Sequence, residues 1–401
     1  MLLARLAWRN LRRSRRRTAL MVAIVALGTW AIIVLWGMED GFVSSMVRAQ
    51  VSLDTGGLQL HRVGYLADPD LKLTFPADQL AALQARLKKI SGIQAFSPRL
   101  LAEGLIQSAY GSTGVEIRGF DPELESRTTI LSKSLIAGRF LTRPGQIVMG
   151  RPLAQQLNLR LGERAVLQVQ GLTRPHSLGL RLVGLLSTGL PRLDRYTVFI
   201  HLQDARALTE VQGASELALA VQHPARLQAR LQALLGPGIK VSTFMELNPL
   251  LSAVSKASRF EGWPTMFLLA LLASFGVANT ITATVLERTR ELGIMLALGL
   301  RPGQLKRLIG LEALFTSGLG FLLGALLGYG LNAYLARVGF DLSAYSQAFP
   351  DLGMPHVLYS MVSVWHGIYA FIAVVLTALL AARLPARRAA QLEPTEAMRY
   401  V

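Results

Sequence analysis

The sequence predicts a membrane protein with four transmembrane α-helices. One precedes a large α+β extracytoplasmic domain and three follow it. Apolar runs stand at Ala19–Met38, Phe267–Leu286, Ile309–Leu335 and Gly367–Ala382. A bilayer core of about 30 Å needs a helix of about 20 apolar residues, so each run is close to spanning length. Roughly 220 residues of ordinary soluble composition separate the first run from the second.

The distribution of charge predicts the orientation. Residues 1–18 contain seven arginines and no acidic residue, residues 287–307 contain five basic residues, and residues 383–401 contain four. The segment 336–361 has one arginine against two aspartates. Because cytoplasmic loops are enriched in Lys and Arg, both termini and residues 287–307 are expected in the cytoplasm. The net charge of +17 therefore reflects membrane topology, and no nucleic-acid partner is expected.

These patterns divide the chain into nine segments. We expect a cytoplasmic amphipathic helix at 1–17, spans at 18–38, 263–286, 308–335 and 362–383, the extracytoplasmic domain at 39–262, a cytoplasmic loop at 287–307, a short outer loop at 336–361 and a cytoplasmic tail at 384–401. For residues 1–17 the alternative to an amphipathic helix is a charge cluster that only sets topology, and both can hold. The first apolar run is too long for a signal peptide, which predicts an uncleaved anchor.

Within 39–262, apolar spacing alternates between strand-like and helix-like. Strands are expected at Leu58–Val63, Val115–Gly119, Gln146–Met149, Ala165–Gln170, Leu180–Leu185, Tyr196–Ile200, Glu216–Val221 and Lys240–Thr243. Helices are expected at Ala77–Lys89, Arg151–Leu157, Leu202–Leu208 and Ala225–Leu234. Two subdomains would fit this order. A further helix is expected to run from Phe244 through Trp263 into the second span.

The loop after the second span is the main candidate site. It reads Glu287-Arg-Thr-Arg-Glu-Leu-Gly-Ile-Met-Leu-Ala-Leu-Gly299. Glu287 and Glu291 share a helical face, and Arg290 is three residues from Glu287. An apolar side is formed by Leu292, Met295, Leu296 and Leu298. A short helix with one apolar side, ended by Gly299, is suited to docking in a groove of another protein; a plain hairpin connection is the alternative.

The spans contain features that favour helix packing. Gly320, Gly324 and Gly328 recur every four residues, which lets another helix approach closely, and Asn279 makes the second span partly polar. Glu312 lies near the start of the third span. An acid there can mark a transport site, but pairing with Arg307 or Lys306 at the interface is the simpler interpretation.

The sequence lacks the usual signatures of catalysis. It has no cysteine, no phosphate-binding loop of the G-x-x-x-x-G-K-[ST] type, and six histidines without ligand spacing. We therefore expect no catalytic, cofactor-binding or metal-binding residue in this chain. The spans also lack the charged relays of an ion-coupled pump, so a partner protein is expected to supply energy.

Three motifs resemble one family, the FtsX-like, MacB-type (type VII) ABC transporter permeases. These are the Glu287–Gly299 run, the tail Leu384-Pro-Ala-Arg-Arg-Ala-Ala-Gln-Leu-Glu-Pro-Thr-Glu-Ala-Met-Arg-Tyr400, and the opening Ala7-Trp-Arg-Asn-Leu-Arg-Arg13. The resemblance implies a bacterial inner-membrane protein with a MacB-like periplasmic core domain. It also implies that residues 287–299 form the helix that couples to the ATPase. The coupling residues carried over are Glu287, Arg288, Arg290, Glu291, Leu292, Gly293, Leu296, Leu298 and Gly299.

Length and outer-domain size are most similar to the lipoprotein-releasing permeases. The resemblance implies an ABC ATPase dimer that binds ATP and Mg, a second permease chain (identical or paralogous), membrane lipids, and a lipoprotein or amphipathic substrate. A periplasmic carrier is a further partner that the resemblance implies, but the Gln170–Leu178 connection is short where some of these permeases have a long carrier-recruiting loop, so docking of a carrier through this subunit is left open. Two alternatives stay open: export of peptides or hydrophobic drugs, and a signalling permease that activates an extracytoplasmic enzyme.

Overall fold

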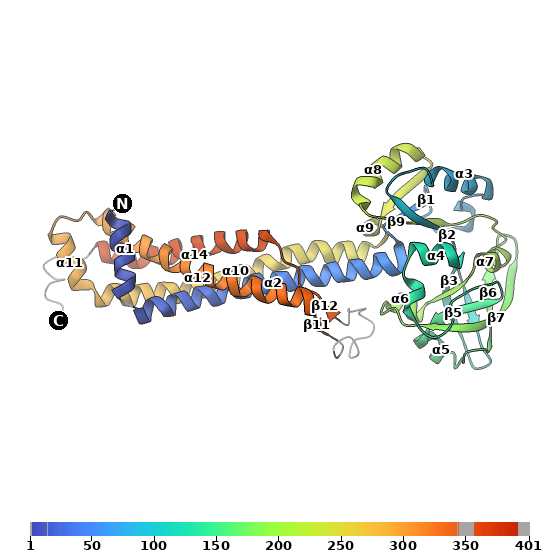
Figure 1. The fold of residues 1–401 in the computed structure, drawn as a ribbon, viewed down its shortest axis with the longest axis horizontal. Coiled ribbons are helices and arrows are strands. Elements are labelled where there is room, and N and C mark those ends of the chain that lie inside the picture. The colour runs from blue at the N-terminus through green and yellow to red at the C-terminus, as the bar shows by residue number, and fades with distance from the viewer. Residues whose placement is uncertain (1, 14, 343, 345–356, 392–401) are drawn as a thin grey trace. The chain divides into compact units, whose positions relative to one another are not determined.

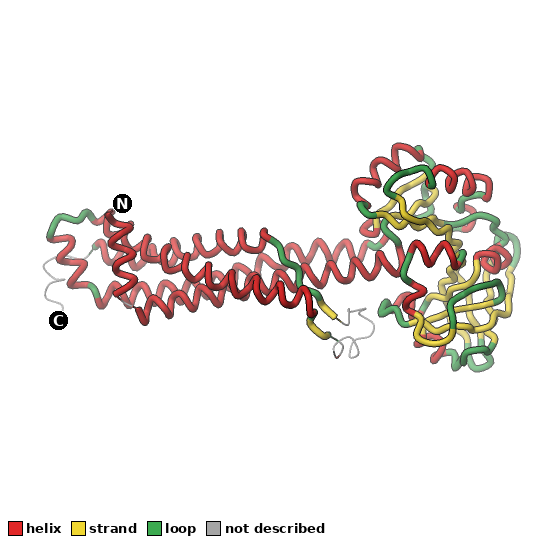
Figure 2. The backbone as a smooth tube through the Cα atoms, in the orientation of Figure 1, coloured by secondary structure: helices red, strands yellow, loops and turns green. Residues whose placement is uncertain are grey.

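The computed structural model describes residues 2–13, 15–342, 344 and 357–391. Its contacts divide the chain into two compact units. The first comprises residues 1–43, 255–340 and 357–401, and the second comprises residues 44–254 and 341–356. Figure 1 shows the elements by label, and Figure 2 shows that the first unit is helical while the large sheet belongs to the second.

Over the described residues, four helical stretches that lie wholly or mostly in the first unit are long and apolar enough to cross a membrane, judged by length and composition. These stretches are Arg15–Thr55, Gly262–Glu287, Pro302–Val338 and Val364–Ala390. They match the four apolar runs of the sequence. The helices involved are α1 (Leu2–Arg13), α2 (Arg15–Gln50), α10 (Pro249–Glu287), α11 (Thr289–Ala297), α12 (Pro302–Val338) and α14 (Val364–Ala390). Two short strands, β11 (Phe340–Asp341) and β12 (Val357–Leu358), lie between α12 and α14.

Two apolar clusters hold these helices together. The larger one joins α1, α2, α10, α11, α12 and α14, with Ala7, Val25, Ile281, Leu292 and Leu305 among its buried members. The smaller one surrounds Ile32, Ile33 and Ala370. Because α1 and α11 contribute to the larger cluster, both flanking segments pack onto the same helical core as the spans. The predicted amphipathic N-terminal helix is thus confirmed as a helix, and its Ala7 is fully buried.

The second unit contains a ten-stranded sheet. Its strands are β1 (Leu58–Arg62), β2 (Ile93–Gln107), β3 (Ser112–Phe120), β4 (Leu135–Gly138), β5 (Gln146–Gly150), β6 (Arg164–Gln170), β7 (Pro175–Leu186), β8 (Thr197–His201), β9 (Glu216–Val221) and β10 (Ile239–Thr243). Its helices are α3 (Ala77–Leu87), α4 (Pro122–Thr128), α5 (Arg151–Gln156), α6 (Pro191–Arg195), α7 (Leu202–Thr209), α8 (Pro224–Leu235) and α9 (Phe244–Leu247). Short turns of other helix types are η1 (Val51–Thr55), η2 (Leu71–Leu73) and η3 (Leu131–Ser134).

Six of the strands close into a ring. Strand β2 pairs with β3 and β6, β3 with β8, β8 with β5, β5 with β7, and β7 with β6. The β3–β8 and β5–β7 pairs are parallel and the others are antiparallel. In β6 every second residue is buried, so Ala165, Leu167 and Val169 point into the ring. Gly104 of β2 is needed where β2 meets β6, because a Cβ there would collide with the Gln168 carbonyl.

The rest of the sheet forms a second core. Strand β9 pairs with the first part of β2 and with β1, and β1 pairs with β10. Helices α3 and α8 pack on this part through Leu80, Leu83, Leu87, Leu227 and Leu231. The ring has its own cluster around Leu167 and Ile200. A third buried cluster, with Phe120, Val148 and Phe199 among its members, lies in the same unit, so the two-subdomain division stays a prediction.

Most predicted elements are confirmed, but the longest strand was not predicted. Strand β2 has 15 residues and contains Pro98 and Gly104, both of which weaken a strand assignment. Its burial does not alternate cleanly, because one strand contributes to both cores. The helix expected from Phe244 is interrupted at Asn248, and α10 then continues through Pro264.

Candidate functional site

The segment 287–299 folds differently from the single helix that its sequence suggested. Glu287 is the last residue of α10, and Arg288 breaks the helix with φ −103° and ψ 15°. Helix α11 then runs from Thr289 to Ala297. Glu287 and Glu291 therefore belong to different helices, which corrects the expectation that they share one helical face. The buried Thr289 hydroxyl bonds back to the Leu286 carbonyl at 2.7 Å, which stabilises this break.

Gly299 ends the segment as expected. It has φ +94°, a conformation that favours glycine. Its N–H donates to the Leu296 carbonyl at 3.0 Å, and the Leu300 N–H donates to the Met295 carbonyl at 3.0 Å. This pair of bonds is a Schellman motif. Pro302 then begins α12, and the Gln304 side chain accepts from the Arg301 N–H at 3.0 Å.

Ion pairs connect this segment to α1, α2 and α12. Arg288 bonds Glu291 at 3.1 Å and Glu312 at 3.5 Å. Arg13 pairs with Glu291 at 3.1 Å, and Arg17 pairs with Glu287. The N-terminal arginines were expected in an amphipathic helix at the cytoplasmic interface, and these ion pairs with Glu287 and Glu291 were not predicted. They give the segment a defined position on its own helices.

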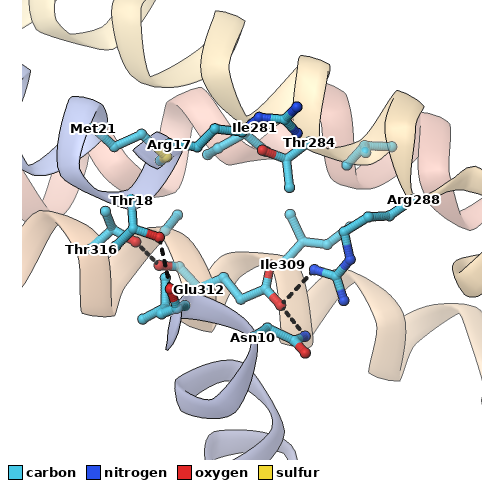
Figure 3. A pocket seen from close by; sticks show the side chains of 13 residues that line it. Asn10, Arg17, Thr18, Met21, Ile281, Thr284, Arg288, Ile309, Glu312 and Thr316 are labelled. Atoms are coloured by element: carbon cyan, nitrogen blue, oxygen red, sulfur yellow. Dashed lines mark hydrogen bonds and ion pairs between the residues drawn. The ribbon is translucent and has the colours of Figure 1, made fainter. Parts of the chain in front are cut away.

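Glu312 sits in a small pocket of about 40 Å³, large enough for about one water molecule (Figure 3). The Asn10 side-chain amide donates to Glu312 at 2.5 Å, and Arg288 approaches the same oxygen. Pairing with Arg307 or Lys306 was expected; the structure pairs Glu312 with Asn10 and Arg288 instead. The reason is that α1 folds back onto α12, which a reading of local spacing cannot reveal.

The apolar side predicted for the docking helix is divided between two directions. Leu292 is buried, and Met295 and Leu296 pack against the helical core. Leu298 is 83% exposed and Ile294 is 42% exposed. Gly293 is buried, whereas Arg290 is exposed. Within α11 and its C-terminal turn, the large side chains exposed to a partner are therefore Arg290, Ile294 and Leu298. Leu292, Gly293 and Leu296 instead attach the helix to this chain.

The glycine series of α12 lies against α2. A Cβ on Gly320 would lie 2.7 Å from Val25 Cβ, one on Gly324 would collide with the Ala26 carbonyl, and one on Gly328 would lie 3.1 Å from Ile33 Cβ. The two helices approach closely because these positions lack side chains. Asn279 of α10 does not take part in such packing and is exposed on this chain.

A substitution in this series should separate close packing from general effects of glycine. Gly324→Ala should destabilise the helical unit by about 1–3 kcal/mol, because the added methyl overpacks the contact with Ala26. Gly318→Ala is the matched control, since a Cβ there meets nothing within 4 Å and alanine favours helix. Thermal denaturation of both variants in detergent would measure the difference. Equal melting temperatures would contradict the packing role.

The second unit contains a buried charge network that no sequence motif predicted. Arg99 is fully buried and bonds Glu125 through Nε at 2.9 Å and Nη2 at 2.6 Å. Its Nη1 donates to the Asp54 carbonyl at 2.6 Å and to Glu216 at 3.2 Å. Arg118, also buried, pairs with Asp54 and with Glu116. The network joins η1, α4, β2, β3 and β9.

Electrostatics keep these groups ionised. Burial would raise the pKa of Glu125, but the Arg99 guanidinium and its hydrogen bonds outweigh burial and leave that pKa below its ordinary value. The pKa of Glu116 is lowered in the same way by Arg118 and Arg192, against the effect of burial. The same attraction raises the pKa of Arg99 despite its burial. Arg99 and Glu125 therefore stay charged at neutral pH.

A cavity of about 340 Å³ lies beside this network. Its wall combines polar groups such as His61, Glu116 and Arg118 with the apolar side chains Leu71 and Leu101. A volume in this range could hold a small molecule. Among the described residues no group of three or more His, Cys, Asp or Glu side chains could hold a metal ion.

The chain matches two family models. Residues 18–234 match the MacB-like periplasmic core domain, and residues 265–394 match the FtsX-like permease C-terminal region. It is 26% identical to the lipoprotein-releasing system transmembrane protein LolC of Neisseria meningitidis, over 98% of this chain and 99% of that protein. It is 28% identical to the macrolide export ATP-binding/permease protein MacB of Rhodospirillum rubrum, over 98% of this chain and 59% of that protein. The periplasmic region of MacB from Actinobacillus actinomycetemcomitans superposes with a TM-score of 0.36 at 12% identity, covering 53% of this chain and 97% of that structure.

The core-domain match covers more than half of the chain. The protein therefore belongs to the ABC transporter permeases that join a MacB-like periplasmic core domain to an FtsX-like permease region. It is a membrane protein with an extracytoplasmic domain. Part of the C-terminal motif, residues 392–401, lies outside the described residues.

Proposed function

We propose that the chain is the permease subunit of an ABC transporter whose separate ATPase drives motion of the periplasmic domain. That motion extracts lipoproteins, or lipids, from the outer leaflet of the inner membrane. The observation that carries this proposal is segment 287–299, which is anchored to its own helices by ion pairs yet presents Arg290, Ile294 and Leu298 outward. A partner that pushes on those three side chains would displace the C-terminal end of α10 and the N-terminal end of α12 as one body.

The proposed orientation follows the positive charge. Both termini and residues 287–307 face the cytoplasm, the large domain is periplasmic, and the spans are arranged one before that domain and three after it. ATP and Mg bind to the partner ATPase and none of this chain's residues is catalytic. A second permease chain, identical or paralogous, completes the complex, and exposed Asn279 is a candidate contact with it.

Similarity along nearly the full length of a LolC protein favours lipoprotein release. The test uses liposomes that contain this chain, its ATPase and a triacylated lipoprotein. Lipoprotein should become soluble only when ATP and the ATPase are both present. Equal release without the ATPase would overturn the proposal, as would labelling of a thiol introduced by Leu298→Cys from the periplasmic side. The chain contains no other cysteine, so this labelling is specific.

Export of a peptide or hydrophobic drug is the second candidate. The 340 Å³ cavity of the second unit, with its mixed apolar and charged wall, is the observation that favours it. The same liposomes loaded with a macrolide would distinguish the two, since an exporter lowers the drug content and a lipoprotein-releasing permease does not. Copurification of a wall hydrolase, instead of a lipoprotein, would support a signalling permease.

A further inference from the structure

A basic hollow of about 570 Å³ lies in the first unit, beside the Arg288 break. Five arginines line it: Arg13, Arg15, Arg16, Arg17 and Arg288. Glu287 and Glu291 also line it, so five positive groups face two negative ones. Arg13, Arg17 and Arg288 are paired with these glutamates, whereas Arg15 and Arg16 are exposed and make no ion pair with the described residues. The hollow therefore has an excess of positive charge that would attract an anion.

An apolar stripe begins at the edge of the hollow. One face of α2 carries Arg16, Leu20, Ala23 and Leu27, because successive members of this set are four, three and four residues apart. All four are exposed, with Leu20 at 56% and Leu27 at 65%. The stripe extends about 16 Å along the helix axis. The basic hollow and the apolar stripe together match a molecule with an anionic head and an apolar tail.

We propose that this hollow binds the phosphodiester headgroup of an anionic phospholipid, with an acyl chain along the Leu20–Leu27 stripe. Guanidinium groups match phosphate oxygens in geometry as well as charge. A second copy of this chain fits less well, because its own N-terminal arginines would face these ones. The lipid is a resident ligand here and not the transported cargo. Its phosphate would lie next to the Arg17–Glu287 and Arg288–Glu291 pairs, and so would influence the charge around the coupling segment.

The test measures lipid binding by the full chain without any ATPase, so it is independent of the transport proposal. The chain is purified from vesicles of equal parts phosphatidylethanolamine and phosphatidylglycerol, and retained lipids are counted by native mass spectrometry. We expect wild-type protein to retain phosphatidylglycerol selectively. Arg15→Gln with Arg16→Gln should lower its apparent affinity by about tenfold or more, because two guanidinium–phosphate attractions are lost.

The matched control is Arg387→Gln with Arg388→Gln, which removes the same charge from two adjacent, exposed arginines of α14. It should leave retention unchanged, and an equal loss would overturn the proposal in favour of a general charge effect. Equal retention of phosphatidylethanolamine, or displacement by inorganic phosphate, would also overturn it. If the Arg15/Arg16 variant fails to insert, Arg288→Gln tests the same hollow from another helix.

Discussion

Leu298→Asp should shift stimulation of the partner ATPase to more than tenfold higher permease concentrations while leaving the permease folded. Leu298 is the most exposed large apolar side chain of the segment, and a truncated or charged anchor at the centre of an interface typically weakens binding by at least 2 kcal/mol. That loss corresponds to more than a tenfold drop in ATPase affinity. The measurement is ATP hydrolysis by the purified ATPase as increasing amounts of reconstituted permease are added.

Two controls make this result specific. Leu298→Met keeps an apolar side chain of similar size and should retain near-normal stimulation. Lys306→Asp places a new acid on another exposed residue, at the start of α12, and should have a much smaller effect. The melting temperature of Leu298→Asp should stay close to wild type, since the side chain makes few contacts within the chain. Normal stimulation by Leu298→Asp would show that α11 and its C-terminal turn are not the docking element.

Arg99→Met should be the most destabilising single substitution in the second unit. It leaves Glu125 and Glu216 buried without their guanidinium partner. Breaking a buried ion pair from one side typically costs about 3–5 kcal/mol. Hydrogen exchange of β2 and α4, followed by mass spectrometry on the full chain, should show a correspondingly faster opening of these elements.

Arg192→Met is the control for this prediction. Arg192 also pairs with a glutamate, Glu116, at 2.7 Å, but its side chain is 60% exposed. Solvent-exposed pairs contribute about 0–1 kcal/mol, so exchange should hardly change. Comparable effects of the two substitutions would show that burial does not determine how much the Arg99 ion pairs contribute to the stability of the unit.

The effect of Arg99→Met should also depend on pH. The pKa of Glu125 is lower in the folded protein than its ordinary value of 4.5, so its pairing stabilises the fold above that value. The stabilisation is lost as pH falls through the folded pKa. In the variant the carboxyl can protonate readily, which relieves the unpaired charge. The difference in exchange between wild type and variant should therefore shrink between pH 7 and pH 4, and a constant difference would exclude the ionic explanation.

The membrane helices were predictable because apolar runs of spanning length have few alternatives. The strands of the extracytoplasmic domain were predictable where polar and apolar residues alternate, as in β6. Strand β2 was missed because it contributes to two cores, and its inward faces change along its length. A strand that packs first in one core and then in another does not keep one alternation of apolar and polar residues, so local periodicity does not predict it.

The candidate site was predicted in composition but not in geometry. Gly299 behaves as expected, because the requirement for positive φ is local. The pairs Arg13–Glu291 and Asn10–Glu312 join residues about 300 positions apart, and only the fold brings them together. The division of the apolar side between Leu292 and Leu298 has the same origin, since burial on one side depends on where α12 lies.

The position of β1 constrains how the protein is made. This strand leaves the ribosome first among the strands of its domain, yet it lies between β9 and β10, which are synthesised last. Pairings so distant in sequence form slowly, because the intervening chain must first be brought to order. The subdomain around β1 therefore cannot complete its fold until residue 243 has been translocated, and a chain whose synthesis stops earlier would display β1 unpaired and open to quality-control proteases.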